Sequence, residues 1–313
     1  MITLYPLKLS AVTKSPIWGG TRLPREWGKR ADTATVGESW ELTVRRLENS
    51  IVLNGPLAGR TLAEVLREAG LLSGEFPLLI KLIDAADALS VQVHPDDAYA
   101  ARVEHDRGKT ELWYIVEADE GAEIVCGLSD GATRADFAAA VRENDPQRVL
   151  KARKVRAGET YFIPAGLPHA IGRGILIAEI QQNCDLTYRV YDYGRLGPDG
   201  APRALHIDKA LDVVRPFTDK EIAALRFSRA SENLAGGEVL ADCAYFRVER
   251  LQTSGAYTLP ACEKWRHLLC LAGSAALVWN GASYPIEKGD SYFLPPLPAL
   301  TVEGAFTALI SAI

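Results

Sequence analysis

The chain has 313 residues, 48% of them hydrophobic, which is enough to bury a core in one large or two ordinary domains. Its formal net charge of −5, without any run of basic residues, argues against a nucleic-acid partner. Five cysteines without CxxC pairing are typical of reduced thiols, and no apolar stretch has the length of a membrane span, so we expect a cytoplasmic protein with no membrane partner.

Strand-like segments outnumber helix-like ones along the chain. Capping-box patterns at Thr61 to Glu64 and Thr133 to Asp136 predict helices that end at Gly70 and near residue 141. Two more amphipathic stretches predict helices at about 208–214 and 219–225. Short apolar or alternating runs predict strands at 50–53, 78–83, 112–116, 160–163, 175–180, 245–251, 268–271 and 276–279. The balance indicates a mostly β protein with inserted helices.

The run 89–94 places polar residues on one face of an apolar strand. Because strand side chains alternate, Ser90, Gln92 and His94 point the same way. Gln92 and His94 could both reach one metal ion if another segment brought further ligands. Taken alone, the run fits an antiparallel strand with its polar face in water better than a metal site.

A short segment occurs twice, once at 158–164 and once at 289–295. Both copies begin with glycine and end with proline, which predicts a tight turn, a strand and a stop. The first copy continues to His169, whereas the second has no histidine at the matching position. We therefore expect two related barrels, one active and one serving as scaffold.

The first copy resembles the second sequence motif of the cupins, small jelly-roll barrels that often hold a metal. The motif runs from Gly158 through Pro164 and Gly166 to His169. Between the two histidine segments, Lys109 and Glu111 lie on one face where a strand begins. Alone, this pair would be ordinary charge at a solvated strand end.

Together these segments resemble the type I mannose-6-phosphate isomerases, in their shorter bacterial branch. The resemblance begins at Trp18-Gly19, continues through 38–41 and 77–81, and includes the run from Glu179 to Arg195, which is its most specific motif. Two departures are visible, because Ile171 and Arg195 stand where longer relatives carry a tyrosine and a lysine. Both could change how the sugar sits without touching the metal ligands.

The resemblance implies one zinc ion per chain, held by Gln92, His94, Glu111 and His169. Imidazole, carboxylate and amide ligands without thiolate suit zinc with a position left for water or substrate. Two histidines and a carboxylate could also bind non-haem iron in an oxygenase. A fourth ligand at Gln92 argues against iron, because it fills a position that dioxygen would need.

The implied reaction interconverts mannose 6-phosphate and fructose 6-phosphate by proton transfer between C1 and C2 through an enediolate. The resemblance offers Lys109, Glu179, Asp185 and Arg189 as catalytic groups, and we favour Lys109 or Glu179 as the base because an arginine is almost always charged. Lys81 interrupts an apolar run, so it either meets an anion or forms a structural ion pair. The expected substrate and phosphate contacts are Lys81, Ser90, Arg195, Trp18 and Glu38.

The expected architecture is mostly β, with two cupin-like jelly-roll barrels and a helical insertion in the first. Residues 1–225 would form the catalytic barrel with the insertion at about 96–150, and 226–313 a smaller jelly roll without metal ligands. Two other functions remain open, a cupin iron oxygenase and a non-catalytic sugar-binding or regulatory module. The sequence leaves the general base, the oligomeric state, the pathway direction and a preference for a neighbouring phosphosugar undecided.

Overall fold

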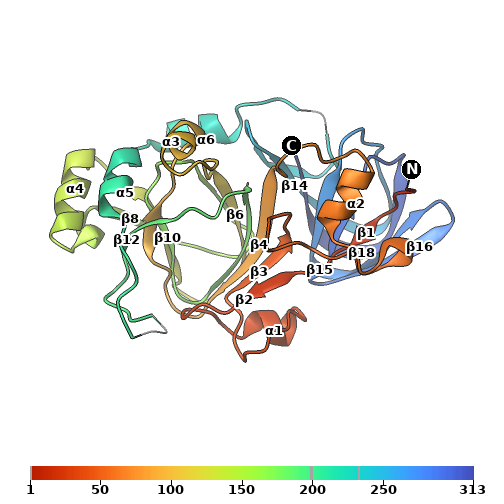
Figure 1. Cartoon of the computed structure of the whole chain (residues 1–313), viewed down its shortest axis with the longest axis horizontal. Helices are drawn as coiled ribbons and strands as arrows, with labels where there is room; N and C mark the ends of the chain where they lie inside the picture. Colours follow the sequence, from red (N-terminus) through yellow and green to blue (C-terminus); the bar gives the residue numbers. More distant parts are fainter. Residues whose placement is uncertain (1, 198–199, 232) are drawn as a thin grey trace.

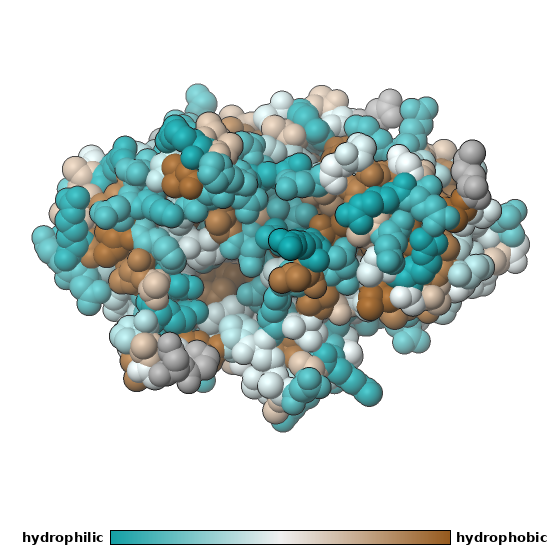
Figure 2. All heavy atoms as spheres, in the orientation of Figure 1, coloured by the Kyte–Doolittle hydropathy of each residue, from teal (hydrophilic) through white to brown (hydrophobic). Residues whose placement is uncertain are grey.

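In the computed structural model, which describes residues 2–197, 200–231 and 233–313, the strands form three antiparallel sheets. The protein is mostly β, as the sequence predicts, and it combines two packed sheets at one end with a third at the other (Figure 1). Hydrophilic side chains cover most of the face drawn in Figure 2, and hydrophobic ones appear there in scattered groups. Within the described residues, no helix has the length and apolar character needed to cross a membrane.

Two sheets pack face to face in the first half of the chain (Figure 1). Apolar side chains from both sheets fill the space between them, among them Trp113, Ile163 and Ile171. The six-stranded sheet has the order β2 (Val12–Lys14), β3 (Glu38–Leu42), β4 (Leu78–Ala85), β11 (Ile175–Gln182), β6 (Glu111–Ala118) and β9 (Thr160–Ile163). The five-stranded sheet has the order β12 (Tyr188–Tyr191), β5 (Val91–Val93), β10 (His169–Ile171), β7 (Glu123–Leu128) and β8 (Leu150–Lys154).

The third sheet has seven strands and is built mainly from the C-terminal part of the chain. Its order is β1 (Leu7–Lys8), β17 (Ser291–Leu294), β15 (Arg266–Trp279), β18 (Leu300–Ala312), β14 (Arg247–Leu259) and β13 (Glu238–Asp242), with β16 (Ala282–Glu287) paired to β15. The N-terminal strand β1 thus belongs to this sheet, since Leu7 pairs with Phe293. A shared apolar cluster that includes Leu82, Leu112 and Leu309 joins the third sheet to the six-stranded one. Division of the chain at residue 225 stays a proposal, and β1 lies across that boundary.

The helices lie outside the sheets. They are α1 (Arg22–Glu26), α2 (Leu62–Glu68), α3 (Asp97–Val103), α4 (Arg134–Arg142), α5 (Ile207–Val213) and α6 (Asp219–Arg226), with short 3₁₀ turns at Gly55–Leu57 and Pro146–Val149. The four helices predicted from the sequence correspond to α2, α4, α5 and α6, and the capping boxes at Thr61 and Thr133 are both present. Helix α3 lies within the helical insertion expected at about 96–150, and α1 has no counterpart among the sequence predictions.

The insertion expected at about 96–150 contains strands β6 and β7 between α3 and α4, and the strand predicted at 112–116 lies in β6. Two local expectations need correction. The run 50–53 makes only isolated bridges, to Leu9 and Thr61, rather than a strand. The runs 268–271 and 276–279 belong to one long strand, β15. In each case the pairing partner, which lies far away in sequence, decides how the segment is used.

The repeated segment occupies matching positions in the two halves. Gly158 and Gly289 both have φ near +90°, at +90° and +87°, a region that favours glycine. In the strands that follow, Ile163 pairs with Glu111 and Leu294 pairs with Arg266. The interior position that holds Glu111 in the first half therefore holds Arg266 in the second, a cation that cannot ligate a metal. This supports the proposal that the C-terminal sheet is scaffold.

Candidate metal centre and substrate cavity

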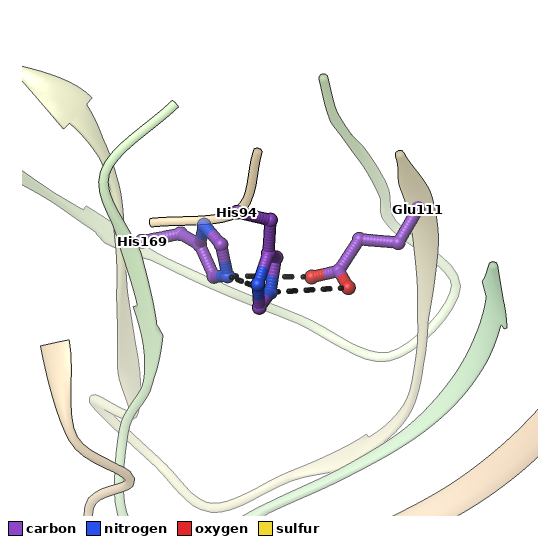
Figure 3. A group of neighbouring side chains, drawn as sticks. All are labelled: His94, Glu111 and His169. Carbon is purple, nitrogen blue, oxygen red and sulfur yellow. Dashed lines mark hydrogen bonds and ion pairs between the residues drawn. The ribbon is translucent and has the colours of Figure 1, made fainter. Parts of the chain in front are cut away.

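Three side chains converge in the space between the first two sheets (Figure 3). His94 follows β5, His169 begins β10 and Glu111 begins β6, so both sheets contribute. The two histidine Nε2 atoms lie 3.1 Å apart, and His169 Nε2 lies 3.4 Å from Glu111 Oε1. The three potential ligand atoms all lie within 4.8 Å of one another, and the three residues are almost fully buried. The fold thus brings together His94 and His169, which are separated by 75 positions in the sequence.

The residues of this cluster suit a metal ion. Within the described chain neither carboxylate oxygen of Glu111 accepts a hydrogen bond, although both are buried. The Nδ1 atom of His169 donates to the Leu167 carbonyl at 2.7 Å, which leaves Nε2 as a lone-pair donor facing the cluster. Burial lowers the pKa of His169 to about 3 and that of His94 well below its usual value, so both imidazoles are neutral, as metal ligands must be.

Lys109 is the nearest cation to the cluster. Its Nζ lies 3.1 Å from His94 Nε2 and 2.9 Å from Glu111 Oε2. Burial alone would lower its pKa, but the charges of Glu111 and Glu179 outweigh burial and raise it. An ammonium group therefore lies directly beside the candidate metal ligands.

Gln92 occupies the strand beside His169. Its backbone is in register with His169 on one side and with Arg189 on the other. Its side chain is only partly buried and lines a neighbouring cavity together with Lys109. Its role as fourth metal ligand stays a prediction.

A cavity of about 150 Å³ is lined by Lys109, whose Nζ contacts the candidate metal ligands His94 and Glu111. The candidates named from the sequence that line it are Trp18, Glu38, Lys81, Ser90, Gln92, Lys109, Glu179, Asp185 and Arg189. Ile171, one of the two departures from longer relatives, also lines it. Strands from both sheets thus place most of the expected substrate contacts around one space.

Three carboxylates surround Lys81 within the cavity wall. Its Nζ lies 3.3 Å from Glu38, 3.6 Å from Glu179 and 3.5 Å from Asp185. It also lies 4.9 Å from the centre of the Trp40 ring. Burial by itself would lower the pKa of Lys81, but these carboxylates raise it above its usual value, so the amine stays charged. The protein itself therefore compensates the charge of this lysine.

Glu179 is a buried carboxyl group between the two lysines. Trp113 Nε1 donates to its Oε1 at 2.9 Å. Burial raises the pKa of Glu179, as does the nearby charge of Glu111, while Lys109 and Lys81 lower it; the net direction is upward. A carboxyl group that binds a proton more readily than usual beside a cavity is suited to proton transfer.

The arginines that line the cavity are not the pair named from the sequence. Arg189 lies in its wall, with Nε 3.2 Å from Ser90 Oγ and Nη1 2.9 Å from the Ala204 carbonyl. Arg203 lies there too and is held by Asp192 through Nε at 2.7 Å. Arg195 lies outside the described lining, bound to Asp192, Asp87 and the Ala88 carbonyl. Sequence reasoning missed Arg203, whose only local signal is a cation after a Gly- and Pro-rich loop.

Two protein-family models match the chain. The model described as "Phosphomannose isomerase type I, catalytic domain" matches residues 6–139, and that described as "Mannose-6-phosphate isomerase, cupin domain" matches residues 238–313. Among curated proteins, the chain is 37% identical to the probable mannose-6-phosphate isomerase GmuF of Bacillus subtilis, over 98% of this chain and 99% of that protein. It is 38% identical to the mannose-6-phosphate isomerase of Streptococcus mutans, over 93% and 92% of the two chains.

Solved structures give the same result. The crystal structure of mannose 6-phosphate isomerase from Bacillus subtilis superposes with a TM-score of 0.90 at 34% identity, covering 99% of this chain and all of that one. A putative mannosephosphate isomerase from Archaeoglobus fulgidus matches with a TM-score of 0.73 at 20% identity, covering 98% and 96% of the two chains, which shows a shared fold.

Proposed function

Since the chain belongs to the type I mannose-6-phosphate isomerases, we propose that it interconverts mannose 6-phosphate and fructose 6-phosphate by metal-assisted proton transfer between C1 and C2. One observation carries the proposal from the family to this chain. The buried cluster of His94, Glu111 and His169 adjoins a cavity lined by two lysines, three carboxyl groups and two arginines. This combination offers metal ligands, proton-transfer groups and phosphate-binding cations in one space.

We propose zinc as the metal, held by His94, Glu111 and His169, with Gln92 as the fourth ligand. Two imidazoles, one carboxylate and one amide oxygen suit zinc and provide no thiolate. When bound, the ion would supply positive charge where the sugar oxygens become negative as the C–H bond breaks. Among the described residues neither Glu111 oxygen accepts an assigned hydrogen bond and Oε2 has an ion pair with Lys109, which leaves Oε1 facing the His169 imidazole and supports this assignment.

We place proton transfer on Lys109 or Glu179, which both line the cavity, Glu179 from β11 and Lys109 from the segment just before β6. Lys109 would act as the base only in its neutral form, which the charge of a bound divalent ion beside it would favour. The base would take the proton from C2 of the aldose, and the proton would be returned at C1 to give the ketose. Arg189 stays protonated and offsets negative charge on the substrate. Asp185 belongs to the carboxylates that hold Lys81 and lines the cavity.

We propose that Arg189 and Arg203 bind the phosphate. Both line the cavity, and both carry guanidinium groups, which suit phosphate oxygens. Ser90 accepts from Arg189 and lies in the same wall, while Trp18 and Glu38 line the sugar side. Lys81, also assigned from the sequence, has its charge compensated by three carboxylates, and Arg195 does not line the cavity. This favours Arg189 and Arg203, which do line it.

A coupled assay for fructose 6-phosphate tests the proposed function. We expect turnover of mannose 6-phosphate in anaerobic buffer, loss of turnover on removal of metal by a chelator, and recovery with zinc. Metal analysis of the purified protein should find one zinc per chain. Iron dependence with oxygen consumption, or sugar binding without turnover in the zinc-loaded protein, would contradict the proposal.

Replacement of Lys109 by Met tests the base. If Lys109 removes the C2 proton, the variant should retain bound zinc but lose isomerisation and exchange of the C2 hydrogen with deuterated water. The matched variant Glu179→Gln tests the other candidate in the same way. Full activity in either variant removes that residue from proton transfer.

A further inference from the structure

A β-bulge lies in the strand that carries Glu38 to the cavity. In β3, Trp40 pairs with Lys81 and Leu42 with Ile80, so Glu41 is one extra residue between two successive pairs. A bulge interrupts the ladder, bends its strand and re-aims neighbouring side chains. Such a feature needs other contacts to hold it, because its backbone groups lack their regular partners.

The C-terminal sheet supplies those contacts. Ser291 at the start of β17 donates its hydroxyl hydrogen to the Glu41 carbonyl at 2.7 Å. His267 on β15 contacts the same hydroxyl through Nε2, also at 2.7 Å. Both residues are buried. The backbone oxygen of the bulge is thus bound by a side chain 250 positions away in the sequence.

Lys29 holds the side chain of the same residue. Its Nζ donates to Glu41 Oε2 at 2.6 Å and to the Gly289 carbonyl at 2.6 Å. The other carboxylate oxygen accepts from Ser39 at 2.7 Å. A side chain at Gly289 would collide with the Trp27 carbonyl, since a Cβ there would lie 2.8 Å from that oxygen. The glycine of the second repeat copy therefore allows the turn to approach the end of α1.

The other face of β3 reaches the substrate cavity. Trp40 Nε1 donates to Glu38 Oε2 at 2.7 Å, and the same oxygen lies 3.3 Å from Lys81 Nζ. The Trp40 ring also lies beneath that ammonium group. Glu38 and Lys81 both line the cavity. A small movement of the bulge would therefore shift the part of the cavity wall that Glu38 and Lys81 form.

We propose that the C-terminal sheet is a positioning device for the substrate cavity, in which Ser291, backed by His267, together with Lys29 pins the Glu41 bulge and so holds Glu38 and Trp40 against Lys81. The inference rests on the proposed function for its kinetic consequence, but not for the contact itself. In the C-terminal sheet, Arg266 occupies the position that corresponds to the candidate ligand Glu111. The proposal gives this sheet a role in substrate binding. Ser291 and Lys29 touch no substrate, and they act through β3.

Hydrogen exchange tests the pin without reference to activity. In the zinc-loaded full-length protein, Ser291→Ala and Lys29→Met should each speed exchange of the amides in 38–42 by about tenfold, as expected when a buried hydrogen bond worth about 1.4 kcal/mol is lost. Exchange in β6 should stay as in the parent protein. Unchanged exchange in 38–42, or faster exchange in all three sheets alike, would overturn the proposal.

Kinetics test the consequence. Both variants should raise KM for mannose 6-phosphate by about tenfold with kcat within about twofold, and Lys29→Arg should restore KM. The control is Lys8→Met, which breaks the 2.7 Å ion pair between β1 and Asp290 at the same turn. Among the described residues, the hydrogen bonds and ion pairs of Lys8 are made with Asn54, Leu53, Asp290 and the β17 strand, not with β3. An equal rise of KM in the control would overturn the positioning role. Absence of turnover in the parent protein would instead refute the proposed function, and the exchange experiment would still decide on the pin.

Discussion

At the scale of single residues, the site depends on buried polar groups whose charges are matched within a few ångströms. Glu111 is fully buried beside two neutral imidazoles, and its oxygens have an ammonium at 2.9 Å as their nearest cation. Burying a carboxylate in this way is costly unless a cation compensates it. A divalent ion among His94, Glu111 and His169 would do so and at the same time support the chemistry.

Glu111→Gln should therefore weaken metal binding. The amide keeps the shape of the side chain but removes the charge, so we expect metal affinity to fall by more than about a hundredfold, since loss even of groups that only support a ligand costs tenfold to a hundredfold. Metal content after dialysis and the coupled assay measure the effect. Glu117→Gln, on the exposed end of the same strand, is the control and should behave as the parent protein. Retention of stoichiometric metal by Glu111→Gln would contradict the metal assignment.

The two arginines that share Asp192 allow a direct test of the phosphate site. Arg203→Met should raise KM for mannose 6-phosphate by about tenfold to a hundredfold, because it removes a charge-assisted hydrogen bond to the phosphate. Arg195→Met removes the neighbouring cation from the same carboxylate outside the cavity and should have a smaller effect. Competition by inorganic phosphate should weaken in parallel with KM. A larger rise of KM in Arg195→Met than in Arg203→Met would indicate that Arg195 binds the phosphate instead.

At the scale of elements, the strands position the candidate site and the helices support the strands. The candidate metal ligands begin or follow strands, at positions where two sheets converge. Helices α4 and α5 pack against the outside of the five-stranded sheet (Figure 1), and their buried residues, such as Phe137 and Leu211, form a separate apolar cluster with Val93. These helices support the sheet that carries His169 without entering the cavity.

The cap of α4 offers a test of this support. Thr133 accepts from the backbone of Asp136, whose side chain binds back to Thr133, so Thr133→Ala should lower the free energy of unfolding by about 1 kcal/mol. Thr133→Ser should retain most of it, because serine caps equally well. Urea unfolding followed by circular dichroism measures the difference. Equal stability of the alanine and serine variants would show that the cap contributes nothing.

At the scale of the whole molecule, the two halves are joined by an apolar cluster with buried polar groups inside it. His267 lies in this contact, fully buried, with its Nε2 bound to Ser291 and the charge of Lys29 nearby. Burial, together with Lys29, lowers the pKa of His267 from 6.5 to about 3. The folded protein therefore keeps this imidazole neutral, whereas the unfolded chain protonates it at mildly acidic pH.

This difference predicts the pH dependence of stability. Because the folded pKa is the lower one, the contribution of His267 is complete above pH 6.5 and is lost as pH falls toward 3, by up to about 1.4 kcal/mol per pH unit. His267→Gln keeps a donor for Ser291 but cannot titrate, so its free energy of unfolding should fall less steeply between pH 6 and pH 4. Urea titrations at several pH values compare the two slopes. Parallel slopes would show that His267 is not protonated on unfolding in this range.

The sequence by itself determined the features that are encoded over a few residues. The Gly and Pro pattern located the repeated turn and strand, and the capping boxes located α2 and α4, while the period of two predicted one face for Gln92 and His94. Resemblance to a family extended these local patterns to a metal cluster and a set of cavity residues, and the structure brings His94, Glu111 and His169 together.

Only the tertiary structure decided which charges reach the cavity. Arg203 and Arg195 look alike in the sequence, yet Arg203 lies in the cavity wall and Arg195 among carboxylates beside it. The contact of Ser291 with Glu41 likewise joins residues 250 positions apart. The physical reason is that local patterns depend on backbone geometry within one strand or turn, whereas these contacts depend on how separate sheets pack against each other, which few neighbouring residues can specify.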